Sequence, residues 1–173
     1  MKEVHYQDTD AFVKLSKALY DKLKPVQDRE IAYLCIGTDR STGDSLGPLI
    51  GTLLKNKGVK NVYGTFDDPA HMISYKAIYE IIKADLDNPY IVAIDAGLST
   101  SDNVGLVMVK DEGVWPGSGV GKETKEIGDM SIVGIVNVGG FMEYYILQNT
   151  RLSLVMNMAD LIASVIDVIG GCR

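Results

Sequence analysis

Residues 31–48 read IAYLCIGTDRSTGDSLGP. The first six are apolar throughout rather than alternating, which is typical of a strand buried on both faces of a parallel sheet. Gly37 ends this apolar run, and a polar loop that contains Asp44 follows it. Apolar residues then recur at helical spacing over residues 46–54, beginning beside Pro48. The stretch therefore predicts a strand, a loop and a helix in direct succession.

The same alternation of strand and helix patterns continues along the chain. Further apolar runs predict strands at residues 59–65, 90–94, 104–109 and 132–138. Helical periodicity predicts helices at residues 10–24, 46–58, 73–84, 141–147 and 152–166. Residues 112–128 have no periodicity, which predicts a long surface loop. Because right-handed crossovers place helices on both faces of a sheet, this order predicts an α/β fold with three α/β/α layers and a largely parallel central sheet.

The composition fits one domain and disfavours nucleic acid as a binding partner. The 173 residues are expected to form a single α/β domain, 1–173, that buries roughly two thirds of the unfolded chain's surface. The net charge is −6 and there is no basic block, which disfavours nucleic-acid binding. No signal peptide and no apolar run long enough to span a membrane are recognised. Cys35 and Cys172 form no CxxC pair, so a reduced, cytoplasmic location is expected.

Two carboxylates, Asp44 and Asp95, follow predicted strands. Each also has an ordinary interpretation, Asp44 as a helix N-cap and Asp95 as a turn residue. Because the carboxyl ends of parallel strands form the edge where ligands bind, we expect the two side chains to converge there. Repulsion between them would then leave one ionised and the other protonated near neutral pH. Such a pair is an acid and a base for the attack of water on an amide carbonyl.

Residues near the two carboxylates in sequence, together with a glycine-rich loop, are the expected substrate-binding positions. They are Gly43, Ser45, His71, Gly97, Gly117, Ser118 and Gly119. The glycine-rich segment is not a phosphate loop, since that motif needs Gly at Pro116 and Ser or Thr at Glu123. It also fails the Rossmann fingerprint, whose third Gly falls on Lys122. Its backbone N–H groups remain candidates for holding a carbonyl or carboxylate.

Other kinds of site are weaker or remain open. Asp44, Asp95 and His71 together could bind a divalent metal, although an acid–base pair requires neither metal nor cofactor. Ser118 lies in no Gly-x-Ser-x-Gly elbow and Cys35 sits within a strand, so neither is expected to be a nucleophile. Trp115 and the paired Tyr144 and Tyr145 are candidates for lining a peptide groove or for core positions.

Three segments of the chain, 41–48, 92–96 and 116–121 with 125–127, resemble the spore germination endopeptidase in the same order. The chain length and residues 36–44 resemble more closely the compact YyaC-type sporulation proteins, which are described as spore proteases. The resemblance implies a phosphorylase/hydrolase-like α/β/α fold, shared with hydrogenase-maturation endopeptidases. It covers about residues 31–138, which include both carboxylates.

The resemblance also carries implications for function. It implies that Asp44 and Asp95 hydrolyse peptide bonds without a metal, and that the substrates are small acid-soluble spore proteins of the forespore or spore core. Homo-oligomers are also implied. In the hydrogenase-maturation relatives the acidic positions bind nickel together with a histidine, and no histidine follows Asp95 here. The chain is shorter than the germination endopeptidase, which leaves substrate and self-processing open.

Two functions are therefore expected from the sequence. The first is an aspartate-dependent endopeptidase of sporulation or germination that cuts small spore proteins with Asp44 and Asp95. The alternative is a non-catalytic sporulation protein that binds a peptide or partner in the same cleft. Metal-dependent maturation of another protein is a third possibility.

Overall fold

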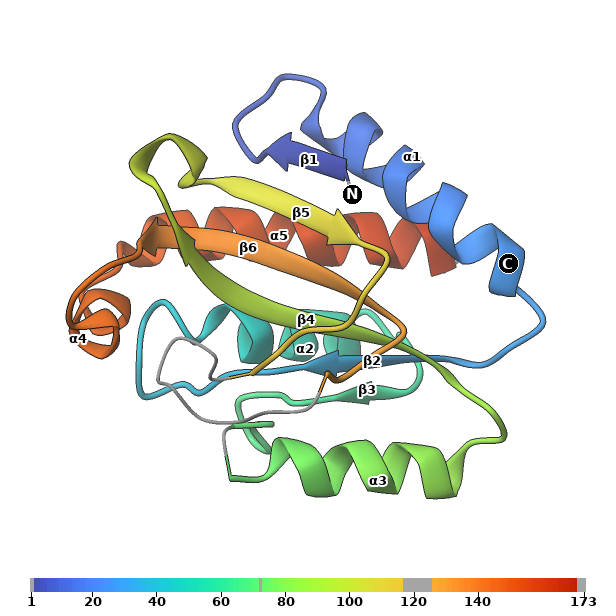
Figure 1. Ribbon diagram of the computed structural model, residues 1–173. Coiled ribbons are helices and arrows are strands. Elements are labelled where there is room, and N and C mark those ends of the chain that lie inside the picture. The colour runs from blue at the N-terminus through green and yellow to red at the C-terminus, as the bar shows by residue number, and fades with distance from the viewer. Residues whose placement is uncertain (1, 72, 117–125, 171–173) are drawn as a thin grey trace.

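The computed structural model describes residues 2–71, 73–116 and 126–170 (Figure 1). Its strands are β1 (Lys2–His5), β2 (Ile31–Cys35), β3 (Val62–Tyr63), β4 (Tyr90–Ser99), β5 (Leu106–Lys110) and β6 (Met130–Val138). Its α-helices are α1 (Ala11–Leu23), α2 (Leu46–Asn56), α3 (Tyr75–Asp85), α4 (Glu143–Gln148) and α5 (Leu152–Gly170). Short 3₁₀ turns, Lys24–Val26 and Ser101–Asn103, follow α1 and β4.

The strands form a single mixed sheet in the order β1-β5-β6-β4-β2-β3. Strands β3, β2, β4 and β6 are parallel. Strand β5 is antiparallel to β6, and β1 is antiparallel to β5. Strands β2, β3 and β4 each follow an α-helix, whereas β5 follows β4 after a short connection. Strand β6 follows β5, and none of the described α-helices lies between them.

Helices cover both faces of the sheet, which confirms the predicted three-layer α/β/α fold (Figure 1). Along β2, Tyr33 and Cys35 pack into the core formed with α1, α2 and α5. The residues that alternate with them, Ala32 and Leu34, face the core that contains Tyr75 and Ile82 of α3. Successive side chains of a strand point to opposite faces, so the unbroken apolar run at residues 31–36 is explained by burial on both sides.

Strand β4 differs from the sequence prediction in a way that affects the site. The apolar run predicted a strand that ends before Asp95, but β4 continues to Ser99. Its extension pairs with β6, from Asp95 opposite Val133 to Ser99 opposite Val138. The prediction was wrong because backbone pairing with a distant segment, rather than side-chain hydrophobicity, sustains this part of the strand.

Smaller differences concern the ends of the other elements. Strand β1 was not predicted, and β3 is shorter than the predicted strand at 59–65. Within the predicted loop 112–128, Val114 and Ile127 form an antiparallel bridge and are both buried. Residues 117–125 of this loop lie outside the described residues.

Helix α5 corrects the expectation that no segment matches a membrane span. By length and composition alone, α5 is long and apolar enough to cross a bilayer. In the fold, its residues Val155, Met158 and Ile162 are fully buried in the core, and the helix packs against α1 and α2. This is the packing of a core helix in a globular α/β protein, which is compatible with a cytoplasmic location.

Candidate active site

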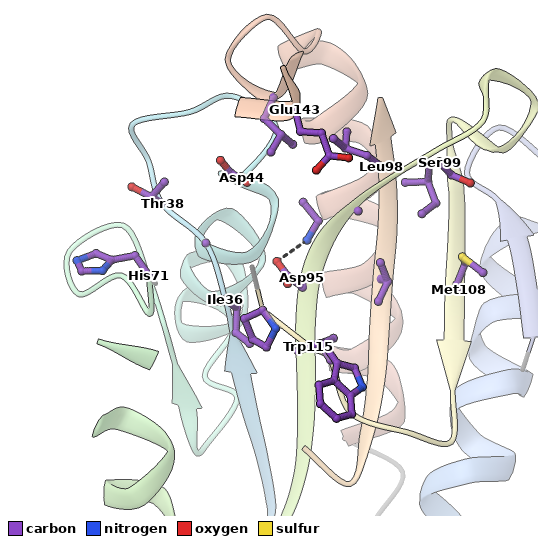
Figure 2. Close-up of a pocket in the computed structure, with 18 of the residues that line it drawn as sticks. Ile36, Thr38, Asp44, His71, Asp95, Leu98, Ser99, Met108, Trp115 and Glu143 are labelled. Carbon is purple, nitrogen blue, oxygen red and sulfur yellow. Dashed lines mark hydrogen bonds between the residues drawn. The ribbon is translucent and has the colours of Figure 1, made fainter. Parts of the chain in front are cut away.

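The cavity that contains both carboxylates lies where the sheet changes winding direction. From β2 the chain passes through α2 to β3 on one side, and then returns through α3 to β4 on the other side of β2. The crevice at the carboxyl ends of two such strands is the usual ligand site of an open α/β sheet. A cavity of about 920 Å³ occupies this position. Its lining includes Ile36, Thr38, Arg40, Asp44, His71, Asp95, Gly97, Leu98, Ser99, Met108, Lys110, Trp115, Glu143 and Tyr144 (Figure 2).

Asp44 is placed by the loop between β2 and α2. The N-cap position of α2 is occupied by Ser45, whose hydroxyl donates a hydrogen bond to the Thr42 carbonyl at 2.7 Å. Helix α2 thus begins at Leu46, and the capping role considered for Asp44 does not apply. The Asp44 side chain lines the cavity instead.

Asp95 lies within β4, on the sheet face that also carries Ile91 and Ala93. It is paired with Val133 of β6, so its interpretation as a turn residue was wrong. Its Oδ1 accepts a hydrogen bond from the Ala96 backbone N–H at 2.8 Å, which turns the carboxyl group toward the strand edge (Figure 2). That edge is the one beside the end of β2, where Asp44 enters the cavity.

Burial raises the pKa of both carboxyl groups. It raises the pKa of Asp95 from 3.8 to about 8; the Ala96 N–H opposes this effect, and the charge of Asp44 adds to it. Burial also raises the pKa of Asp44, against the effect of the Ser41 hydroxyl. The charge on Asp44 contributes to the raised pKa of Asp95, so an ionised Asp44 favours the protonated form of Asp95. With a pKa of about 8, Asp95 keeps its proton at neutral pH, so the arrangement can supply an acid at Asp95 and a base at Asp44.

The predicted substrate-binding residues fall into three groups. His71 and Gly97 line the cavity with the two carboxylates. Gly43 and Ser45 are buried beside it, where the Gly43 N–H donates to the Leu147 carbonyl at 2.9 Å. Their positions indicate that they shape the loop that carries Asp44. Gly117, Ser118 and Gly119 lie outside the described residues.

Several lining residues were not singled out from the sequence as site residues. Glu143, on α4, lies at the same end of the cavity as Asp44 and Leu98 (Figure 2). Lys110 reaches the cavity from β5 and Arg40 from the loop after β2. Nothing in the sequence near these residues indicates that they reach the cavity. The pairing of β5 with β6 brings Lys110 there, and the position of α4 brings Glu143. The aromatic side chains of Trp115 and Tyr144, considered as groove residues, do line the cavity.

The described part of the chain contains no cluster of side chains suited to metal binding. Among residues 2–71, 73–116 and 126–170, no group of three His, Cys, Asp or Glu side chains is placed to hold a metal ion. His71 shares the cavity with Asp44 and Asp95 without completing such a group. Its Nδ1 instead lies 3.2 Å from the Ile73 backbone nitrogen and accepts a hydrogen bond from it.

Close contact between α2 and β2 fixes the loop that carries Asp44, and it gives a testable prediction. A Cβ at Gly47 would lie 2.0 Å from the Ile36 carbonyl oxygen, so the helix would have to move. We expect Gly47→Ala to lower the free energy of unfolding by about 3 kcal/mol, as overpacking does in cores. Urea denaturation measures this change. The control is Gly170→Ala, where nothing lies within 4 Å, and equal stability of the two variants would contradict the prediction.

Comparison with known proteins gives two matches. A family model described as "Protein of unknown function (DUF1256)" matches residues 3–165. The uncharacterized protein YyaC of Bacillus subtilis (strain 168) is 46% identical over 162 residues, which cover 92% of this chain and 79% of that protein. The residues matched by the family model include both cavity carboxylates, Asp44 and Asp95.

Proposed function

The chain belongs to the DUF1256 family of proteins of unknown function, and we propose that it is an endopeptidase whose acid–base pair is Asp95 and Asp44. One observation carries the proposal: two carboxyl groups share a cavity at the switch point of the sheet, where burial raises the pKa of Asp95 to about 8 and the charge of Asp44 adds to that rise. Pairs of carboxyl groups whose environments push their pKa values apart are the usual basis of acid and base roles.

In the proposed reaction, Asp44 acts on the attacking water molecule and Asp95 acts on the peptide carbonyl group. The Asp44 carboxylate takes a proton from a water molecule as the water oxygen attacks the peptide carbonyl carbon. The Asp95 carboxyl group donates its proton to the carbonyl oxygen, which gives a tetrahedral diol with Asp44 protonated and Asp95 ionised. As the C–N bond breaks, Asp44 donates the proton it gained to the leaving nitrogen, and one diol hydroxyl gives its proton to Asp95. The products are a new carboxyl group and a new amine. Asp44 is then ionised and Asp95 protonated, as at the start.

The substrate and the biological setting are proposed from the sequence resemblance. Similarity to sporulation proteases supports small acid-soluble spore proteins as substrates and the forespore or spore core as the location. The cavity is lined by the charged residues Arg40 and Lys110 and by the aromatic residues Trp115 and Tyr144, which suits a polypeptide better than a single small molecule.

The test is a cleavage assay. Purified protein and its Asp44→Asn variant are incubated with small acid-soluble spore proteins, and products are mapped by mass spectrometry. Discrete fragments from the wild type alone support the proposal. Intact substrate in both samples, together with saturable binding, favours the alternative of a protein that binds a peptide or partner in the same cleft.

The pH dependence of cleavage is a separate prediction. We expect kcat/KM to rise as Asp44 loses its proton, above its ordinary pKa of 3.8, and to fall near pH 8 as Asp95 loses its own. Initial rates measured across this range give the profile. A rate that keeps rising well above pH 8 would show that a protonated Asp95 is not required.

A further inference from the structure

One edge of β4 is open where it passes the end of β2. The pairing of these strands ends with Cys35 opposite Ile94, whereas β4 continues to Ser99. Beyond Ile36 the chain turns away into the loop that carries Asp44. The result is a strip of β4 over residues 96–99, roughly 13 Å long at the usual rise of a strand, that lines the cavity.

The direction of the backbone groups on this strip follows from the hydrogen bonds around it. The Ile94 carbonyl accepts from the Ile36 N–H at 2.7 Å on the β2 side, and the Ser99 carbonyl accepts from the Gly139 N–H at 2.7 Å on the β6 side. Backbone groups of a strand alternate, so those of Ala96 and Leu98 point to the β2 side. Beyond the end of β2, that side is the cavity.

Some of these groups have no partner in the described part of the chain. The Ala96 N–H is occupied by the Asp95 carboxyl group. The register of β4 against β6 shifts between Gly97 and Leu98, but the Ser99 carbonyl still bonds on the β6 side, so the Ala96 carbonyl and both backbone groups of Leu98 point away from β6. No hydrogen bond from outside the strand ladder reaches them in the described part of the chain. An unpaired strand edge of this kind is a template for another extended chain.

We propose that the strip 96–99 of β4 binds an extended polypeptide as an added strand, in the place that β2 leaves empty. This inference rests on the proposed function, since it assigns how the substrate main chain is held. A peptide residue opposite this edge accepts a hydrogen bond from the Leu98 N–H and donates one to the Leu98 or Ala96 carbonyl. The Asp95 carboxyl group lies at the beginning of the strip, so the peptide bond that reaches it lies next to the acid–base pair.

Two consequences for the substrate follow. Only a segment free of its own secondary structure can add to a sheet edge, so the substrate is an unfolded or disordered stretch of protein. Recognition through main-chain groups tolerates many sequences, with side-chain preferences set by the cavity walls. His71 and Trp115 lie on those walls.

The test measures binding apart from cleavage. Fluorescein-labelled peptides are tiled over a small acid-soluble spore protein and over β-casein, an unstructured protein, and their binding to the Asp95→Asn variant is followed by anisotropy. A second substitution, Leu98→Pro, removes the N–H on the cavity side, and we expect it to weaken binding about tenfold. Leu98→Val retains that N–H and is the matched control. Circular dichroism checks that each variant is folded.

A scan of the peptide keeps the test independent of variant folding. N-methylation of each residue in turn is expected to weaken binding at every second position, because alternate N–H groups of an added strand face β4. If binding shows this alternation but the wild type does not cleave the peptides, the result supports peptide binding by the strip 96–99. The same result rejects the endopeptidase function. If cleavage is insensitive to Leu98→Pro and to the position of methylation, peptide binding by the strip 96–99 is rejected and the endopeptidase function is retained. Absence of binding by all peptides overturns the inference.

Discussion

Replacing Asp95 by asparagine is expected to lower kcat/KM for peptide hydrolysis by roughly 10³-fold, the usual contribution of a positioned general acid. Asparagine keeps the volume of the side chain, and its oxygen can still accept the hydrogen bond from the Ala96 N–H. It cannot supply the acidic proton that the raised pKa of Asp95, about 8, retains at neutral pH. The loss should therefore appear mainly in kcat rather than in KM.

The control for this prediction is a carboxylate outside the cavity. Asp102 is exposed in the turn after β4, so Asp102→Asn should leave cleavage unchanged. Initial rates on one mapped peptide, with circular dichroism of each variant, make the comparison. Near-wild-type turnover by folded Asp95→Asn protein would reject Asp95 as the general acid, and an equal loss in Asp102→Asn would point to a general effect of charge.

The second prediction is that wild-type stability falls between about pH 4 and pH 8 relative to Asp95→Asn. The pKa of Asp95 is about 8 in the folded chain, against 3.8 as its ordinary value. Between these values the folded state binds more protons than the unfolded state, so the free energy of unfolding falls as pH rises. The difference should reach a few kcal/mol at about pH 8 and disappear below pH 4.

Urea denaturation of the wild type and Asp95→Asn at several pH values measures this difference directly. The variant lacks the titrating group, so its stability should exceed that of the wild type increasingly toward pH 8. Titrating groups that do not interact with Asp95 contribute equally to both proteins and cancel in the difference. Asp102→Asn should follow the wild-type curve, and parallel curves for the wild type and Asp95→Asn would mean that Asp95 is not held protonated in the folded state.

Much of the architecture could be predicted from local patterns. The apolar run over residues 31–36 is buried on both faces because β2 lies inside the sheet, and the helical spacing after Pro48 corresponds to α2. The sequence also placed Asp44 and Asp95 near strand ends, and both line one cavity. The helix around residues 141–147 was predicted, but not that it brings Glu143 to the cavity.

The sequence by itself determined the order of the strands and helices after β1, the three layers and the two candidate carboxylates, because these depend on side-chain patterns within short windows. Only the tertiary structure decided that β4 continues past Asp95, that β2 and β4 flank the switch point, and that an edge of β4 remains open. Strand pairing joins segments distant in the chain, and side-chain patterns do not encode it locally. The raised pKa of Asp95 has the same origin, since desolvation is produced by everything that packs around a group rather than by its neighbours in sequence.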